Sequence, residues 1–584
     1  MRHYLPLSLW LLAFLPSQLN SYAQEGHGVG EPSISSRSIP SPPDSSYAYD
    51  ERKVVFRSSS ILVQVPVVVT DKSGHHIQKL SKDQFTVFEG GQEQKIAAFE
   101  EIAADDSNPL PPSPPGIFRN AGIEFHQTQA VTVIAIDSVN TPFLDQLNAR
   151  QALVKYLADN LKPGPLLAVV VMSSKGMQVI QGLTSSPEPL IDALKRASGQ
   201  FAVMEGVNAS VQTTIAGPSD ALITPNGFRS LYDFVSRGDT LAAQFQQERA
   251  IEMTMRSFLQ VAWSLTGVPG RKSLIWATSG FPFYLGSPGM VPRTGRLATL
   301  YEHALEALND AHIAVYPVDV RGLVSTAPGA DLRGGKGGAA YARYLQNREW
   351  LLQSTFDTLQ EFSRMTGGRA FYNSNDLAEG FRRAVEDSSS YYLLGYYLDT
   401  SNDKPGWRSL KVELQQRDTV VRAPSGFLVT NGAMNPQTTK EADLAFALDS
   451  PFEASGIPIW MQWKPVSGDA KSATREEKAG DIKKVAFELH FPGDIIGTQG
   501  DQNAIELDIF AIVETLGAKA TVSDPIQHTM KANFPPELLA KVRVQGLKYS
   551  SDLSLASGKY AVRFVVRDNV SGRVGSITAP LKVD

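Results

Sequence analysis

The sequence predicts a protein of mixed class, in which an α/β domain stands between two all-β regions. Strand patterns alternate with amphipathic helix patterns between residues 130 and 400, which indicates a doubly wound domain whose mainly parallel sheet is covered on both faces. Residues 54–104 and the chain beyond 440 instead show short strands, turn signals and no helical period. The length of 584 residues is too great for one hydrophobic core, so several domains are expected.

The first residues have the pattern of an export signal. Arg2 and His3 precede the apolar run YLPLSLWLLAFLP, and small residues favour cleavage between Ala23 and Gln24. The run is short for a membrane span, and no later segment approaches ~18 uninterrupted apolar residues. We therefore expect residues 1–23 to be a signal peptide and the mature form, without a transmembrane span, to be periplasmic or secreted. An uncleaved anchor is the alternative.

Composition excludes several functional classes. The chain is 42% hydrophobic and 20% charged, as in ordinary globular proteins. Its net charge is −5 and no basic block stands out, so we expect no nucleic-acid partner. Cysteine is absent, which removes disulfides, thiolate nucleophiles, zinc–thiolate sites and iron–sulfur clusters.

Proline and serine mark the boundaries between the predicted domains. The expected segments are a disordered Ser/Pro-rich tether at 24–53, a small β domain at 54–104, a Pro-rich linker at 105–129, the α/β domain at 130–400, a β-hairpin and linker at 401–439, and an immunoglobulin-like β-sandwich at 440–584. About fifty residues are few for an independent sandwich. Strands within 407–430 are candidates to complete the small β domain, which would make the α/β domain an insertion.

An ordered set of segments resembles a family of exported bacterial proteins that are related to von Willebrand factor A (VWA) and abundant in acidobacteria. The segments are VVVTDKSGHHIQKLSKDQFTVFEGGQEQKIAAFE, VIAIDSVNTPFLDQLNARQAL, KSLIWATSGFP, IAVYPVDVRG, YYLLGY and GKYAVRFVVRDNVSGRVGSI. The resemblance extends from Val54 to Asp584. It implies a VWA domain between β domains, and it implies no enzymatic activity.

The resemblance also implies where a metal site would lie. VWA domains bind Mg²⁺ through an Asp-x-Ser-x-Ser loop, a Thr in a later loop and a further Asp, because Mg²⁺ is a hard cation that prefers oxygen ligands. Here Asp137 and Thr141 fill the first and last loop positions, Thr184 matches the later Thr, Val139 replaces a Ser, and Ser279 replaces the Asp. With one carboxylate left, we expect a degenerate site that binds Mg²⁺ or another divalent cation weakly or not at all, and no other cofactor.

Three structural alternatives accompany that site. Asp137 is expected to cap the following helix or to bond the amides of its own loop. Thr141 is placed to cap a helix that begins at Pro142. Asp319, at the end of another predicted parallel strand, is either a substitute carboxylate on the same rim or a residue that ends its strand by bonding turn amides, with Arg321 as a partner.

The sequence is compatible with two functions. The first is a non-enzymatic binding or adhesion-type protein, whose VWA-like domain contacts a protein or cell-envelope partner. The alternative is an exported hydrolase with an accessory VWA domain. A hydrolase would need catalytic groups in the long insertions, such as Asp233, Asp239 or Asp331, and none of these has a recognisable partner. Neither a His-Glu-x-x-His helix nor a Gly-x-Ser-x-Gly elbow is present.

Overall fold

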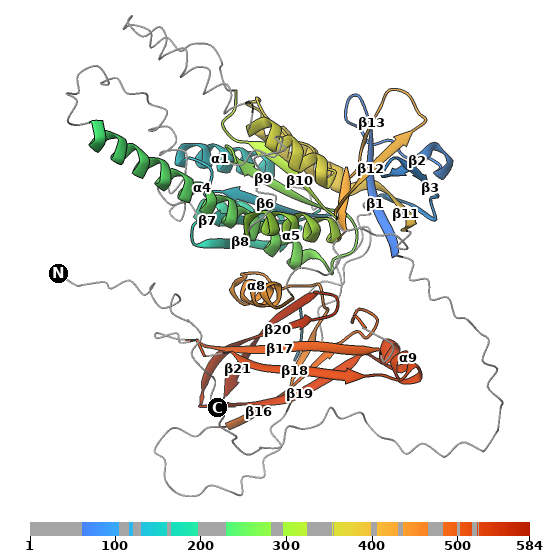
Figure 1. Ribbon diagram of the computed structural model, residues 1–584, viewed down its shortest axis with the longest axis vertical. Helices are drawn as coiled ribbons and strands as arrows, with labels where there is room; N and C mark the ends of the chain where they lie inside the picture. Colours follow the sequence, from blue (N-terminus) through green and yellow to red (C-terminus); the bar gives the residue numbers. More distant parts are fainter. Residues whose placement is uncertain are drawn as a thin grey trace, which may run out of the picture.

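The computed structural model describes the folded parts of the chain, which combine helices with several sheets (Figure 1). The described residues are 61–103, 116–120, 130–159, 165–196, 229–281, 296–323, 353, 355–398, 406–429, 436–464, 483–498, 503–516, 522–523 and 525–583. The predicted signal segment, the tether and most of the Pro-rich linker lie outside these ranges. Among the described helices, none has the length and apolarity needed to cross a bilayer.

A five-stranded sheet forms the centre of the α/β unit, in the order β10-β9-β6-β7-β8. The first four strands are parallel, and every residue of β6, β9 and β10 is buried, as expected for strands covered on both faces. β8 is antiparallel to β7, because a two-residue turn is too short for a parallel crossover. The bounds are β6 Val131–Asp137, β7 Leu166–Ser173, β8 Gly176–Thr184, β9 Lys272–Thr278 and β10 Ile313–Asp319.

Helices cover both faces of this sheet. One face packs against α1 (Phe143–Asp159), α2 (Pro187–Arg196) and α7 (Leu377–Ser389). The other face packs against α4 (Arg229–Leu265), α5 (Arg296–Asp310) and a helix at 355–366. In the second layer, the rings of Phe258 and Phe362 meet the indole of Trp276 edge-on, with centroids 5.2 and 5.7 Å away. The central sheet therefore lies between two apolar layers.

The small β domain is built from strands on both sides of the α/β unit. Its two sheets have the orders β13-β1-β11-β4 and β14-β12-β2-β3, and Val67, Tyr392 and Leu394 lie in the core between them. A 3-10 turn, η1 at Lys82–Gln84, leads into β2. The bounds are β1 Ile61–Asp71, β2 Phe85–Glu89, β3 Gln92–Gln94, β4 Ala98–Ala103, β11 Ser390–Leu398, β12 Gly406–Leu414, β13 Thr419–Arg422 and β14 Gly426–Val429.

One boundary differs from the sequence prediction. The YYLLGYY strand, β11, was expected to be the last strand of a domain ending at residue 400. That prediction is wrong, because β11 lies antiparallel between β1 and β4 in the small β domain. The α/β unit therefore ends with α7 at Ser389, and β11 follows without a loop.

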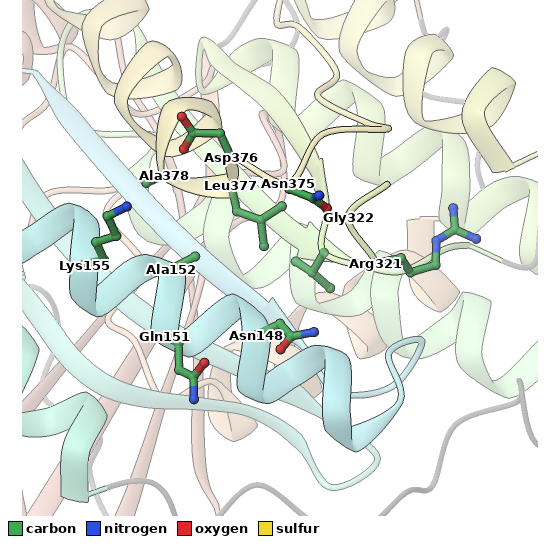
Figure 2. Close-up of a pocket in the computed structure, with 11 residues that line it drawn as sticks. Asn148, Gln151, Ala152, Lys155, Arg321, Gly322, Asn375, Asp376, Leu377 and Ala378 are labelled. Carbon is green, nitrogen blue, oxygen red and sulfur yellow. The ribbon is translucent and has the colours of Figure 1, made fainter. Parts of the chain in front are cut away.

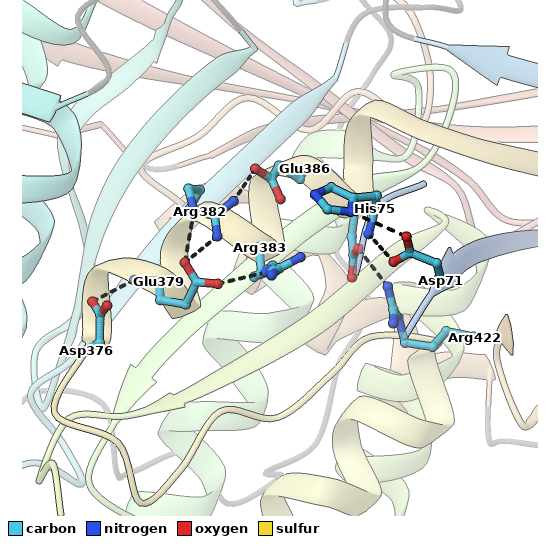
Figure 3. A network of polar contacts seen from close by, with 9 residues as sticks. Asp71, His75, Asp376, Glu379, Arg382, Arg383, Glu386 and Arg422 are labelled. Atoms are coloured by element: carbon cyan, nitrogen blue, oxygen red, sulfur yellow. Dashed lines mark hydrogen bonds and ion pairs between the residues drawn. The ribbon is translucent and has the colours of Figure 1, made fainter. Parts of the chain in front are cut away.

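The junction of α7 with the small β domain carries a network of charged contacts (Figure 3). On α7, Glu379 pairs with both Arg382 and Arg383. The Arg383 guanidinium packs closely against the turn that follows β1. A Cβ atom on Gly74 in that turn would lie 2.1 Å from Arg383 Nη1. Together with the Arg422–Asp387 ion pair at 2.7 Å, these contacts hold the domain against the helix.

The C-terminal domain is a pair of antiparallel sheets with a common core. The sheet orders are β19-β16-β15-β5 and β18-β17-β20-β21. The rings of Phe487 and Phe564 pack between the sheets with centroids 4.7 Å apart. The bounds are β5 Ile117–Arg119, β15 Trp460–Trp463, β16 Lys483–Phe491, β17 Ala504–Thr515, β18 Ile526–Asn533, β19 Leu547–Leu555, β20 Gly558–Asp568 and β21 Val574–Val583.

The structure corrects the sequence analysis of this domain at three places. The predicted linker 105–129 contains β5, which pairs with β15. The chain from 440 onward was expected to be free of helices, yet α8 (Pro436–Asp449) and α9 (Pro536–Gln545) occur there. Both are rich in Glu, Ala, Leu and Lys, which favour helix, and α8 buries Leu444 and Ala447 against the sandwich.

The α/β unit and the C-terminal domain meet in a close contact. The Ser455 hydroxyl donates to the carbonyl of Ser264 at 2.7 Å and accepts from the Gly267 amide at 2.9 Å. A Cβ atom at Gly267 would lie 2.0 Å from the Ser455 carbonyl oxygen, so the two backbones touch. Nearby, Asp443 of α8 lies 3.8 Å from His303 of α5. The contact therefore contains a titratable pair.

These two groups are expected to produce opposite pH dependences. Burial raises the pKa of the Asp443 carboxyl to about 7, so its contribution to stability is full below its ordinary pKa of 3.8 and is lost as pH rises through about 7. Burial lowers the pKa of the His303 imidazole to about 4, so its contribution is full above 6.5 and is lost as pH falls to about 4. In the wild type, the two slopes oppose each other between pH 4 and 6.5.

Single substitutions should separate the two slopes. Relative to wild type, His303→Gln should make the urea midpoint fall more steeply as pH rises from 4 to 7. Asp443→Asn should make the midpoint rise more steeply from pH 4 to 6.5, although Arg567, which donates to Asp443 at 3.0 Å, loses its charged partner. Urea unfolding at half-unit pH steps measures both. Parallel profiles for the two variants would contradict the assignment.

Candidate functional site

The loop that follows β6 lies where a doubly wound sheet normally binds ligands. β6 is the central strand: the chain leaves it toward β7 on one side and later forms β9 and β10 on the other. Ligands in such sheets bind outside the carboxyl ends of the strands, where the strand order reverses. Asp137 is the last residue of β6 and is followed by Ser138, Asn140 and Thr141, and all four are buried. The geometry of these side chains decides what the site can hold.

The Asp137 carboxylate is fully buried and saturated with hydrogen bonds. Its Oδ1 accepts from the amides of Val139 and Asn140, both at 3.0 Å. Its Oδ2 accepts from Asn140 Nδ2 at 2.8 Å, from Trp276 Nε1 at 3.0 Å and from Thr278 Oγ1 at 3.0 Å. A carboxylate offers about four lone-pair sites, so donors of the chain itself occupy all of them.

The electrostatics of this carboxyl are set by burial. Burial raises the pKa of Asp137, and the hydrogen bonds from Asn140, Trp276 and Thr278 act in the opposite direction. Asn140 extends the network, because its Nδ2 also lies 2.9 Å from Thr254 Oγ1 on α4. The carboxyl is thus held by neutral dipoles from its own loop and from β9, and Asn140 extends the network to α4.

Thr141 and Ser279 lie beside this network but face each other's loops. The Ser279 amide donates to Thr141 Oγ1 at 3.0 Å, and Ser279 Oγ donates to the Asn140 carbonyl at 3.2 Å. The prediction that Thr141 caps the following helix is therefore wrong. α1 begins at Phe143, and the Thr141 hydroxyl instead fixes the loop after β9 against the loop after β6.

The prediction that Thr184 shares this site is also wrong. β8 runs antiparallel to β7, so Thr184 pairs with Leu167 at the start of β7, whereas Asp137 pairs with Met172 at its end. Five residues of strand separate those two positions, roughly 16 Å at the usual rise per residue. The Thr184 hydroxyl accepts from the Ser186 amide just before α2. Its role in the described chain is local.

Asp319 occupies the same edge of the sheet at the end of β10, but it is already paired. Arg321 donates to it through Nε at 2.9 Å and through Nη2 at 2.7 Å, and the Arg321 amide adds a third bond at 3.1 Å. This bidentate arrangement satisfies both carboxylate oxygens. Asp319 therefore ends its strand in the way that the structural alternative predicted.

The residues at this edge do not fit a Mg²⁺ ion. Asp137, Thr141 and Ser279 do come together, yet N–H and O–H donors point at the carboxylate that would have to bind the cation. Mg²⁺ needs near-octahedral coordination by oxygen atoms. Within the described part of the chain, no group of three or more His, Asp or Glu side chains is arranged to hold a metal ion.

Trp276 and Asn140 are the functional side chains that sequence reasoning missed. Both donate to Oδ2 of Asp137, and so stand where an ion would contact it. A signal was present: Trp276 is the one aromatic residue in the strand KSLIWAT, and a buried indole N–H usually finds a polar partner. The strand pattern alone does not say which partner.

The surface of this edge carries exposed apolar side chains. Leu144, in the first turn of α1, is 71% exposed, and Leu323, just after β10, is 61% exposed.

Of the residues considered for a hydrolase, Asp233 and Asp239 lie on α4, and Asp331 lies outside the described residues.

Comparisons with known proteins gave no family. No family model matches the sequence, and no curated protein matches it. Solved structures that are similar at low scores include the following three. An aerotolerance-related membrane protein from Bacteroides fragilis has 13% identity over 44% of this chain and 98% of its own, with a TM-score of 0.21. The N-terminal domain of TFIIH p34 has 12% identity over 44% and 97%, with a TM-score of 0.18. A von Willebrand factor type A protein from Catenulispora acidiphila has 10% identity over 85% and 75%, with a TM-score of 0.23.

Proposed function

We propose that the protein is an exported, non-enzymatic binding protein of the VWA-related type. In this proposal, the carboxyl edge of the α/β unit contacts a protein or cell-envelope partner without the help of a metal ion. The sequence motifs shared with VWA-related exported proteins support the proposal. So does a core of parallel strands with helices on both faces.

We also propose that the C-terminal domain is a sandwich of immunoglobulin type. The strand order supports this: β15, β16 and β19 lie in one sheet, while β17, β18, β20 and β21 lie in the other. The chain thus crosses between the two antiparallel sheets after β16, after β18 and after β19, as chains do in Greek-key sandwiches. Such a domain would support the α/β unit rigidly, and its contact at Ser455 holds the two together.

The main support for the binding function is the contrast between the interior and the surface of the carboxyl edge of the central sheet. The Asp137 carboxylate of the β6 loop is satisfied internally by five hydrogen bonds. The surface beside the loop exposes Leu144 and Leu323 instead. Exposed large apolar side chains at a ligand-binding edge favour contact with a partner surface over ion chemistry.

Affinity capture from the native envelope tests this function. The intact protein should recover the same partner in the presence of Mg²⁺ and of EDTA. The double variant Leu144→Ser/Leu323→Ser should lose that partner. Val544→Ser is the matched control, because Val544 is 87% exposed on α9, in the C-terminal domain, and should not matter. Equal loss in the control, or capture that requires Mg²⁺, would contradict the proposal.

A further inference from the structure

A groove separate from the β6 loop lies between α1, the turn after β10 and the start of α7 (Figure 2). Its volume is about 340 Å³, within the range of small ligand sites. The floor is apolar: Val320 and Leu377 are buried there, beside Ala152 and Ala378. Figure 2 shows Ala152 and Leu377 on opposite sides of the groove. The floor can therefore receive an apolar side chain.

The rim of the groove is polar and rich in primary amides. Asn148 and Gln151 of α1 and Asn375, before α7, are all exposed. Asn375 Oδ1 accepts from the Leu323 amide at 2.9 Å, which fixes its side chain in place. A carboxamide offers both a donor and an acceptor, as a peptide bond does. An extended peptide backbone matches this rim.

The charges on the rim are not equivalent. Arg321 is held in a bidentate pair by Asp319, and Figure 2 shows its side chain at the far end of the groove from Lys155. Asp376 caps α7 by accepting from the Glu379 amide at 3.1 Å. Lys155 is exposed and, within the described chain, lies in no ion pair. Among the charged residues that line the groove, the ammonium group of Lys155 is thus the positive charge left for an acidic ligand.

We propose that this groove binds an extended segment of a protein partner that carries an apolar side chain next to an acidic one. The apolar side chain lies on the floor formed by Val320, Leu377 and Ala152. The peptide bonds on either side pair with Asn148 and Asn375, and the carboxylate reaches Lys155. The inference rests on the proposed binding function and gives it a ligand class. Leu144, one helical turn before Asn148, connects the groove to the exposed apolar rim.

Selection of peptides tests the groove directly. A phage-displayed library of random twelve-residue peptides is panned on the full-length mature protein, and an enriched peptide is synthesised with a fluorescent label. Enriched sequences should share an apolar residue beside Asp or Glu. By fluorescence anisotropy, Lys155→Glu should weaken binding at least tenfold, and Ala152→Phe, which fills the floor, should abolish it. Lys195→Glu, the same charge change on exposed α2, should leave binding within twofold.

The outcomes separate the groove from the proposed function. Absence of any enriched peptide, or equal binding to wild type and Lys155→Glu, overturns the groove inference. If the envelope partner is still captured through Leu144 and Leu323 in that case, the proposed function stands alone. If peptides bind the groove although no envelope partner is captured, the proposed function fails and the groove remains a peptide site. Far-ultraviolet circular dichroism of each variant establishes that it is folded.

Discussion

Replacing Asp137 with alanine is expected to lower the free energy of unfolding by about 4 kcal/mol, because it leaves several buried donors without an acceptor. These donors include the amides of Val139 and Asn140 and the indole N–H of Trp276, and the site is shielded from water. Urea unfolding of purified protein measures the change.

Asp145→Ala is the matched control for this prediction. Asp145 is a half-buried carboxyl eight residues further along, and no hydrogen bond to it is found in the described chain. Its loss should cost less than about 1 kcal/mol, the size of a helix first-turn charge effect. An empty metal site behaves differently: removing a ligand carboxylate there leaves stability unchanged or raises it. Wild-type stability in Asp137→Ala would therefore contradict a structural role for the carboxylate.

Residues 54–104 expressed alone are expected to show no cooperative unfolding transition. In the intact chain β1 pairs with β11 and β13, β2 pairs with β12, and β4 pairs with β11, so the fragment lacks a partner of each of these strands. β1 and β4 do not touch each other, because β11 lies between them. Thermal unfolding followed by circular dichroism measures the effect, and a sharp transition in the fragment would contradict the account.

A fusion that removes the α/β unit is the positive control. Ala103 at the end of β4 is paired directly with Ser390 at the start of β11. A short Gly-containing turn can therefore join residues 61–103 to 390–430 as a hairpin. This fusion should unfold cooperatively, although at a lower temperature than the intact protein, because Tyr391 loses its hydrogen bond from the Arg271 amide of the α/β unit.

The strands of the central sheet could be read from sequence because they are buried on both faces. The segment AVTVIAID was expected to be a strand ending in Asp137, and β6 has that form. The sequence could not say which sheet receives a strand. β11 is as apolar as β10, but its partners lie more than 280 residues earlier in the chain. Pairing of that range is set by tertiary packing and leaves no local signal.

The sequence predicts where the site lies, but it does not predict which side chains meet there or how they are hydrogen-bonded. The carboxyl end of β6 was expected to carry the polar loop, and Asp137, Thr141 and Ser279 do meet there. The prediction for Thr184 is wrong because the two-residue turn after β7 makes β8 run antiparallel, which places Thr184 at the other end of the sheet. The donors that occupy Asp137 come from a neighbouring strand and from its own loop, and their orientation is decided by rotamers that a sequence pattern does not contain.

Calorimetric titration of Mg²⁺ and Mn²⁺ into the wild-type protein tests the central claim most directly. The saturated carboxylate at Asp137 predicts no saturable heat at concentrations up to several millimolar, and no change in melting temperature with either ion. The opposite result is equally clear. Saturable binding below 1 mM that Thr141→Val weakens would show that the β6 loop opens to hold a cation. It would contradict the claim that the carboxyl edge of the α/β unit binds its partner without a metal ion.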